Sequence, residues 1–343
     1  MRSSILLVFA GLAMSCGGSK IDQTVLLGKD ARATENSGIA QSSEALSGNK
    51  SISSKSFSKS EGVGKIISFL ASDELKGRES GTEEINIAGQ YIEDYLKNHG
   101  VAPYFSSYKD TLSNFELPTY NIVGYLEGTD KKLKNEFVVI GAHYDHIGIV
   151  PPVAGDSIAN GANDNASGTT AVLEFARYFG EARNNKRSII FALFSAEEKG
   201  LLGAKHLAEK LKNANLDLYT MLNFEMIGLP MPDKDYLMYL TGYEKSNLAE
   251  ISNRYAKENL VGFLPTAQEY NLFMRSDNYP FHTEIGIPSQ TFSTFDFTNF
   301  DHYHQVGDEA AIMDFRHMAN VVNKMIPVLE GIVNAPIKEV KYY

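Results

Sequence analysis

The sequence predicts an α/β protein with one mixed, mostly parallel central sheet and helices on both faces. The first observation is a set of short apolar runs, at residues 136–141, 188–194 and 219–224, which are typical of buried strands. The second is that segments with helical spacing of apolar residues lie between these runs. A chain that alternates strand and helix in this way favours parallel strands joined by crossover helices, which cover the sheet on both sides.

The N-terminal segment differs in composition from the rest of the chain. Arg2 precedes an apolar run at residues 5–13, and small residues then lead to Cys16, the single cysteine of the chain. The run is too short to span a membrane stably, and residues 1–16 resemble a bacterial lipoprotein signal peptide whose cysteine becomes the lipidated first residue. The alternative is an ordinary signal peptide with an incidental cysteine. Residues 17–60 are rich in Ser, Lys, Gly, Ala and Asn, which predicts a flexible tether.

This leader sets the expected location of the protein. We expect it to be exported and anchored to the cell envelope, at the outer membrane, with membrane contact only through the lipid. A lone cysteine excludes a disulfide within the chain. The formal net charge of −10 argues against nucleic acid as a partner, because phosphate binding needs concentrated Lys and Arg.

Residues 61–343 are predicted to form a single domain, since α/β sheets of this size are often one unit. Helices are expected at residues 63–70 and 82–98, where Thr82 can cap the second helix. The stretch 104–117 alternates only loosely and suggests a strand or a loop. A convincing strand follows at residues 121–126, before the apolar runs named above.

The second half of the domain continues the alternation of strands and helices. A Pro- and Gly-rich stretch at 147–161 shows no periodicity, so we expect a long irregular loop of functional importance. One helix is expected to begin near Asn165 or Ser167. Four more are expected at residues 200–211, 246–259, 277–283 and 310–334. Further strands are expected at residues 235–240 and 289–292.

Histidines and carboxylates cluster directly after the predicted strands. His143 and Asp145 follow the strand at 136–141, and Asp164 lies in a Gly- and Asn-rich loop before a helix. Loops at the carboxyl ends of the strands are where open α/β sheets bind ligands. Imidazole with carboxylate suits zinc or another borderline divalent cation. Taken singly, the alternatives are a structural hydrogen bond for His143 and a helix cap for Asp164.

Three further carboxylates are harder to explain as structural. Glu197 and Glu198 follow the run at 188–194, where two acids would repel each other unless a cation or separate roles distinguished them. Glu225 interrupts an apolar segment, and an unpaired carboxylate there would be costly to bury. Near the C-terminus, His302 and His304 are both possible metal ligands.

The order of these motifs resembles the M28 family of metallopeptidases. The resemblance extends from residues 70–78 to the closing helix and is carried by His143-Tyr144-Asp145, residues 161–168, Ala196-Glu197-Glu198, Asn223-Phe224-Glu225-Met226, Ser276-Asp277, Gly286-Ile287-Pro288, and Tyr303-His304 followed by Asp308. It implies a peptide hydrolase with two divalent metal ions, zinc being the expected metal. Such enzymes are mostly aminopeptidases.

The resemblance also implies a role for each residue. Asp164 would bridge the two metals, one of which is also held by His143 and Glu225 and the other by Glu198 and His304. Glu197 would be the general base that activates the water shared by the metals, and Asp145 would orient His143. Where Glu225 stands, the family usually has Asp, so the side chain is one methylene longer here.

The sequence leaves two alternative functions open. One is a glutaminyl-cyclase-like aminoacyltransferase with a single zinc ion, which resembles the same fold. The other is a surface lipoprotein that binds peptides without catalysis. Retention of all the implied ligands favours a hydrolase that releases N-terminal residues from peptide substrates.

Overall fold

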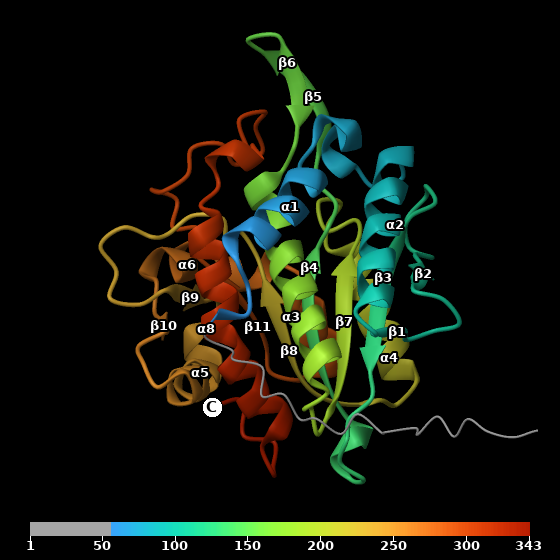
Figure 1. Ribbon diagram of the computed structural model, residues 1–343, viewed down its shortest axis with the longest axis vertical. Coiled ribbons are helices and arrows are strands. Elements are labelled where there is room, and N and C mark those ends of the chain that lie inside the picture. The colour runs from blue at the N-terminus through green and yellow to red at the C-terminus, as the bar shows by residue number, and fades with distance from the viewer. Residues whose placement is uncertain (1–55) are drawn as a thin grey trace, which may run out of the picture. The chain divides into compact units, whose positions relative to one another are not determined.

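A mixed sheet forms the centre of the domain in the computed structural model, which describes residues 56–343 (Figure 1). Its strand order is β1-β3-β7-β4-β8-β11-β9-β10, and β2 pairs with β3. The strands are β1 (Ala102–Pro103), β2 (Lys109–Thr111), β3 (Tyr120–Leu126), β4 (Glu136–His143), β7 (Ser188–Phe194), β8 (Asp217–Phe224), β9 (Met238–Leu240), β10 (Val261–Gly262) and β11 (Ser289–Ser293). The predicted signal peptide and residues 17–55 of the predicted tether lie outside the described residues.

The middle of the sheet is parallel and its flanks are partly antiparallel. β4 pairs in parallel with both β7 and β8, and β11 pairs in parallel with β8. β3 is antiparallel to β7, and β9 is antiparallel to β11. The predicted mixed, mostly parallel sheet is therefore confirmed in its central strands.

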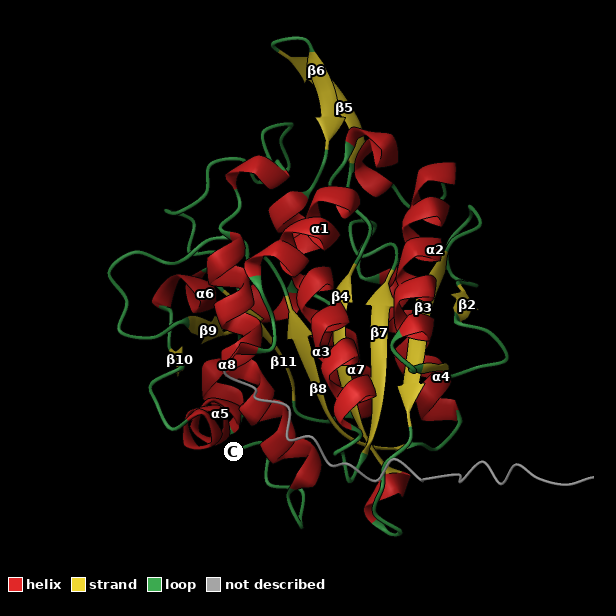
Figure 2. Ribbon diagram, in the orientation of Figure 1, coloured by secondary structure: helices red, strands yellow, loops and turns green. Residues whose placement is uncertain are grey.

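Helices cover both faces of the sheet, as predicted (Figure 2). One face packs against α1 (Ser60–Leu70), α2 (Glu83–Asn98), α3 (Gly168–Ala182) and α8 (Phe315–Asn334), with α5 (Leu248–Ala256) joining the same core. The other face packs against α4 (Leu202–Asn213) and Phe281 of α7 (Asn278–Ile285). The short helix α6 (Pro265–Glu269) was not predicted.

The apolar run of β7 shows why a central strand reads as continuously hydrophobic. Its alternate residues Ile189, Phe191 and Leu193 enter one core, while the intervening Ile190, Ala192 and Phe194 enter the other. Side chains of a strand alternate between faces, so a strand covered on both sides must be apolar throughout. Each large side chain buried here contributes roughly 1.5–3 kcal/mol through removal from water.

The predicted irregular loop at 147–161 is wrong, because this stretch forms a hairpin. β5 (Gly148–Val153) and β6 (Asp156–Ala159) pair antiparallel, with Val153 opposite Asp156. The two residues between them, Ala154 and Gly155, both have positive φ, which matches the twist of a tight hairpin turn. The sequence hid this turn because Ala-Gly is not the usual Asn-Gly or Asp-Gly signal. The hairpin projects from the body of the domain (Figure 1).

The predicted start of the closing helix is also wrong. Residues 310–312 form a separate single turn, and α8 begins only at Phe315. Asp314 sets this start because its carboxylate accepts hydrogen bonds from the backbone N–H groups of Arg316 and His317. Within residues 56–343, no helix has both the length and the apolar character needed to cross a membrane.

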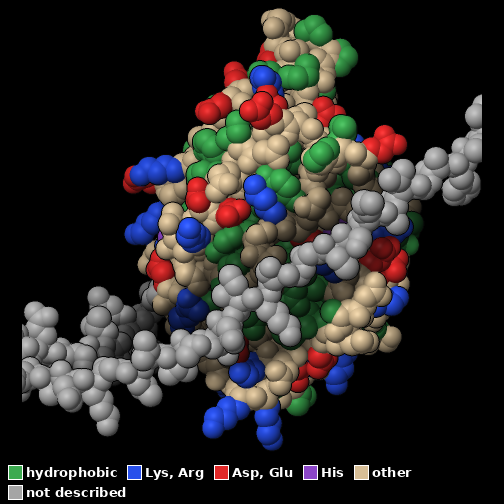
Figure 3. All heavy atoms as spheres, turned by 90° about the vertical axis from the view of Figure 1, so that its right-hand side faces the viewer, with side chains coloured by type: hydrophobic (Ala, Val, Ile, Leu, Met, Phe, Trp, Pro, Cys, Tyr) green, Lys and Arg blue, Asp and Glu red, His purple; other side chains and the backbone are tan. Residues whose placement is uncertain are grey.

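The surface carries charges of both signs. On the face shown in Figure 3, basic and acidic side chains of the described residues are interspersed. Several charged side chains of the described residues form exposed ion pairs, such as that of Lys65 with Glu61 at 2.7 Å. Exposed pairs of this kind contribute little to stability, so the fold depends on its buried apolar clusters.

Candidate metal centre

The candidate site lies at the carboxyl edge of the parallel strands. His143 is the last residue of β4, Glu197 and Glu198 follow β7, and Glu225 follows β8. Because β4 is parallel to β7 and β8, these three strand ends meet at one edge of the sheet. In the register of the first pair, His143 lies opposite Phe194, so the acids after β7 emerge beside the imidazole.

Asp164 reaches this edge from an irregular turn, Ala162–Ser167, that precedes α3. The carboxylate of Asp308 fixes the turn by accepting hydrogen bonds from the backbone N–H groups of Asn163 at 2.6 Å and Asp164 at 3.0 Å. The side-chain oxygen of Asn163 in turn accepts from the N–H of Gly228 at 2.9 Å. The turn is therefore held from both the C-terminal loop and the segment after β8.

The side chains form two groups that share Asp164. His143, Asp164 and Glu225 make one group, and His146, Asp164, Glu198 and His304 make the other, with the ligand atoms of each within 4.8 Å of one another. The two oxygens of Asp164 face different groups. Its Oδ1 lies 3.3 Å from His143 Nε2, and its Oδ2 lies 3.1 Å from His304 Nε2. This is the arrangement expected of a carboxylate that bridges two cations.

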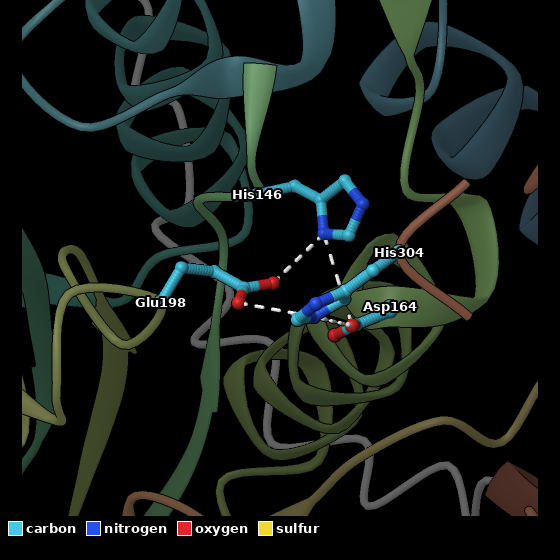
Figure 4. A group of neighbouring side chains, drawn as sticks. All are labelled: His146, Asp164, Glu198 and His304. Carbon is cyan, nitrogen blue, oxygen red and sulfur yellow. Dashed lines mark hydrogen bonds and ion pairs between the residues drawn. The ribbon is translucent and has the colours of Figure 1, made fainter. Parts of the chain in front are cut away.

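The second group shows how segments far apart in the chain converge. His146 follows β4, Glu198 follows β7 and His304 comes from the loop after β11, and all point toward Asp164 (Figure 4). Glu198 contacts a different histidine with each oxygen: His146 Nδ1 at 2.9 Å and His304 Nε2 at 3.1 Å. Sequence reasoning did not name His146 as a ligand. The signal was present, since it follows Asp145 directly.

His143 is oriented by the backbone of its own loop. Its Nδ1 lies 3.2 Å from the carbonyl oxygen of Asp145, whereas the nearest carboxylate oxygen of Asp145 is 3.7 Å away. That carboxylate instead accepts hydrogen bonds from the N–H of Glu197 at 3.2 Å and the hydroxyl of Ser80 at 3.1 Å. Asp145 therefore links His143 to the backbone beside the tandem glutamates.

Three residues of the candidate site have left-handed backbone conformations. Ala196, Met226 and His304 have φ values of 57°, 49° and 57°. Such a conformation is strained for a residue with a side chain and persists only where the surroundings enforce it. At these positions it turns the chain directly before Glu197, directly after Glu225 and at His304 itself.

The charge of the site explains its perturbed titration. Burial raises the pKa of Glu225 to about 7, and burial together with neighbouring acids holds the pKa of Glu197 well above its usual range. Burial opposes ionisation of Asp164 too, but His143 and His304 outweigh it and hold its pKa below the ordinary value. Excess carboxylates packed around few imidazoles favour bound cations.

Arg78 links the two ligand loops, a role that sequence reasoning missed. Its fully buried guanidinium donates hydrogen bonds to the carbonyl oxygens of Tyr144 at 2.8 Å, Asn160 at 2.6 Å and Gly161 at 2.9 Å. It also donates to the carbonyl of Leu70. Burial lowers the pKa of Arg78 to about 10, which leaves it charged at neutral pH.

Other predicted candidates lie outside the two groups. His302 precedes His304 by two residues but belongs to neither group. Asp277 is buried nearby, and neither of its carboxylate oxygens has a hydrogen-bond partner among the described residues. Ser276 donates to Glu225 and so orients that carboxylate.

A hollow lies beside Glu225, on the side away from β4, the strand that ends with His143. Its volume is about 80 Å³, it opens to solvent, and half of the side chains that line it are apolar or aromatic. They include Met226, Leu272, Phe295, Phe297 and Tyr303, with Arg275 also in the wall. The aromatic-rich stretches at residues 270–273 and 292–300 thus both contribute to this hollow.

The donor set fits a pair of metal ions. His143 Nε2 and His304 Nε2 both face carboxylate oxygens without making a hydrogen bond in the described part of the chain. Imidazole nitrogens aimed at carboxylates in this way are typical of ligands arranged around a cation. A mixed α/β sheet with such a centre at its carboxyl edge defines a metal-dependent hydrolase.

Comparison with known proteins specifies the class. The model of peptidase family M28 matches residues 121–329. A probable zinc metalloprotease of Leptosphaeria maculans is 28% identical over 322 residues, covering 80% of this chain and 73% of that protein. The aminopeptidase YwaD of Bacillus subtilis is 36% identical over 179 residues, covering 50% of this chain and 35% of that protein.

Solved structures share the fold at low sequence identity. The LapA aminopeptidase of Legionella pneumophila has a TM-score of 0.63 and 19% identity, covering 82% of this chain and 73% of that one. A glutaminyl cyclase of Porphyromonas gingivalis has a TM-score of 0.62 and 19% identity, covering 81% and 100%. The fold alone therefore does not separate these two activities.

The chain belongs to peptidase family M28. It is a metal-dependent peptide hydrolase, which confirms the reaction class predicted from the sequence.

Proposed function

We propose that this protein is a zinc aminopeptidase that releases N-terminal residues from peptides. The observation that carries the proposal is the pair of donor groups sharing Asp164, with Glu197 next in sequence to the ligand Glu198. His143 and Glu225 would complete one metal site, and Glu198 and His304 the other. Two such ions, when bound, polarise the scissile carbonyl and lower the pKa of water.

Glu197 is the proposed general base. Its backbone N–H is held by Asp145, and its side chain is only partly exposed, so it stands at the inner wall of the site. Its raised pKa suits a carboxylate that takes a proton from the attacking water and passes it to the departing amine. Asp145 is the proposed positioning residue, because it contacts both the backbone of Glu197 and the ring of His143.

The hollow beside Glu225 supports a preference for apolar N-terminal residues. Met226, Leu272 and Phe295 line it together with other apolar side chains, so it suits an aliphatic or aromatic side chain. Arg275 gives one wall a positive charge. A substrate whose first side chain fills this hollow would place its first peptide bond beside Glu225.

Hydrolysis of matched chromogenic substrates tests the proposal. The panel contains free and acyl-blocked leucyl, phenylalanyl and glutamyl amides, assayed before chelation, after chelation and after zinc is added back. We expect cleavage of the free leucyl and phenylalanyl substrates, loss on chelation and recovery with zinc. Activity that is indifferent to the chelator would refute metal dependence, and preference for blocked substrates would refute the aminopeptidase assignment.

The similar fold of a glutaminyl cyclase makes cyclisation the main alternative. The presence of both donor groups, with His143 and Glu225 on one side of Asp164 and Glu198 and His304 on the other, favours a two-metal hydrolase over a one-metal transferase. Metal analysis together with an assay of an N-terminal glutaminyl peptide separates them. One zinc per chain with a cyclised product would establish the alternative, and binding of peptides without turnover would indicate a surface binding protein.

We also propose export and lipid anchoring at Cys16, supported by the leader sequence. The residues concerned lie outside the described part of the chain. Cells expressing the wild type or Cys16→Ser are labelled with a fatty-acid analogue and fractionated. Label and membrane association in the wild type alone would support the anchor, and equal release of both proteins would refute it.

A further inference from the structure

We propose that His146 is a fourth protein ligand of the metal ion that Asp164, Glu198 and His304 hold. The inference rests on the proposed two-metal site and adds a residue to it. It makes the two sites unequal, with four protein ligands around one ion and three around the other.

The spacing of the donor atoms carries the inference. In a tetrahedral zinc site with metal–ligand distances of about 2.0–2.2 Å, neighbouring ligand atoms lie about 3.3–3.6 Å apart. His146 Nδ1 lies 2.9 Å from Glu198 Oε1 and 3.8 Å from Asp164 Oδ2. His304 Nε2 lies 3.1 Å from both Glu198 Oε2 and Asp164 Oδ2. These distances lie on both sides of the roughly 3.3–3.6 Å expected between neighbouring ligands of a tetrahedral zinc ion. His146, like His304, has a ring nitrogen within 3.8 Å of an oxygen of both Glu198 and Asp164.

The ring of His146 is held firmly toward the site. The residue is fully buried, and a β-carbon at Gly161 would meet its ring carbons at 2.5 and 2.6 Å, so glycine there leaves space for the imidazole. Its backbone N–H donates to the carbonyl of Arg78 at 3.3 Å. The guanidinium of Arg78 also donates to the carbonyl of Gly161, so this one buried residue holds the backbone of both His146 and Gly161.

Figure 4 shows Nδ1 of His146 directed toward Glu198 and Asp164 and the second ring nitrogen directed away. That second nitrogen, Nε2, has no hydrogen-bond partner among the described residues. Coordination through Nδ1 would leave the ring proton on Nε2. The structural alternative is that Nδ1 carries the proton and donates it to Glu198, so that His146 only positions that ligand.

Unequal ligand numbers predict unequal affinities. The group containing His146 offers two imidazoles and two carboxylates, whereas the other offers His143, Glu225 and one oxygen of Asp164. Glu225 also accepts a hydrogen bond from Ser276, which competes for its oxygen lone pairs. We therefore expect stepwise loading, with the His146 site filled first.

The experiment measures zinc binding to the purified full chain by competition with a chromophoric chelator. The variants are His146→Ala, which removes the ring, and His146→Gln, which keeps a hydrogen-bond donor for Glu198 but is a poor ligand. His302→Ala is the matched control, because it removes a nearby histidine outside both groups. Glu225→Ala reports on the other site.

We expect two resolved binding steps in the wild type. Loss of a positioning partner typically lowers metal affinity about 10–100-fold, so we expect His146→Ala to weaken the tighter step more than 100-fold. His146→Gln should be as weak as the alanine variant, His302→Ala should match the wild type, and Glu225→Ala should weaken only the second step. Recovery of tight binding in His146→Gln would show that His146 only positions Glu198 and would overturn the inference.

A second measurement avoids dependence on variants that fail to fold. In wild-type protein with ¹⁵N-labelled histidine, one equivalent of zinc should shift the Nδ1 resonance of His146 and leave its proton on Nε2. An unchanged Nδ1 resonance in the zinc-loaded protein would also overturn the inference. If the wild type bound no zinc, the proposed function itself would fail, whereas tight binding that ignores His146 would remove only this ligand.

Discussion

Asp308 holds Asp164 in place by accepting a hydrogen bond from its backbone N–H at 3.0 Å. The two residues are 144 positions apart, and the same carboxylate also accepts from the N–H of Asn163 at 2.6 Å. Burial raises the pKa of Asp308 to about 6, so near neutral pH it is the ionised form that makes these bonds.

The first prediction concerns this contact. Asp308→Asn replaces one accepting oxygen with an amide that can only donate, so the turn carrying Asp164 loses an anchor. We expect zinc affinity to fall about 10–100-fold, as for other residues that orient metal ligands. Competition titration measures it, with the exposed Asp301→Asn as control. Equal affinities in the two variants would contradict the assigned role.

The second prediction separates catalysis from metal binding. Glu197→Gln keeps the size of the side chain but removes the base, so we expect turnover to fall about 10²–10⁴-fold. Zinc stoichiometry and affinity should stay within a few-fold of the wild type. Glu209→Gln, on the exposed face of α4, is the control. Full turnover by a zinc-loaded Glu197→Gln protein would remove Glu197 from its proposed role.

The third prediction tests whether the absence of a β-carbon at Gly161 makes room for Asp164 and His146. Gly161→Ala would bring a β-carbon within 2.4 Å of the carbonyl oxygen of Asp164 and against the ring of His146. Gly286→Ala has a comparable positive φ, but its β-carbon would meet nothing within 4 Å. The control should cost about 1–3 kcal/mol from backbone strain. We expect Gly161→Ala to be clearly less stable in urea unfolding and to bind zinc more weakly, and parity of the two variants would disprove the steric argument.

The fourth prediction compares two buried arginines. Arg78→Lys keeps the charge but loses the fork that joins the carbonyls of Tyr144 and Gly161, so we expect lower stability, by about 3 kcal/mol, and weaker zinc binding. Arg187→Lys also removes a buried guanidinium, but that group contacts Glu136 at 2.7 Å and the end of α8. Arg187→Lys should lower the stability of the protein while the folded protein keeps its zinc affinity. If both variants lost zinc affinity, the loss would be a general result of removing a buried guanidinium and not a role of Arg78.

The fifth prediction concerns stability against pH. Burial lowers the pKa of His317, on α8, to about 4, from an ordinary value near 6.5. Between these values the unfolded chain binds the proton and the folded one does not, so stability is present above pH 6.5 and is lost as pH falls toward 4. The full effect is on the order of 3 kcal/mol. Chemical unfolding of wild type and His317→Gln from pH 4 to 7 should show a shallower slope in the variant, and equal slopes would contradict it.

The sequence by itself determined the central strands of the sheet, most of its helices and most of the candidate site. Apolar runs such as that of β7 must be buried on both faces, and carboxylates placed just after them must then lie at the edge where parallel strands end. For this reason the sequence predicts that His143, Glu198 and Glu225 lie close together. The resemblance to a peptidase family added the roles of Asp164 and Glu197, the choice of His304 over His302 and the expectation of two metal ions.

Only the tertiary structure decided what holds those residues in position. The hairpin β5–β6, the place of His146 in the second group and the anchoring by Arg78 and Asp308 all depend on contacts between segments far apart in the chain. No local pattern encodes such contacts, because a buried hydrogen bond to a backbone carbonyl leaves no periodicity in the sequence. Whether a side chain such as Arg78 or Asp308 reaches a loop far away in the sequence depends on how the helices and strands pack. Only the complete fold determines that packing.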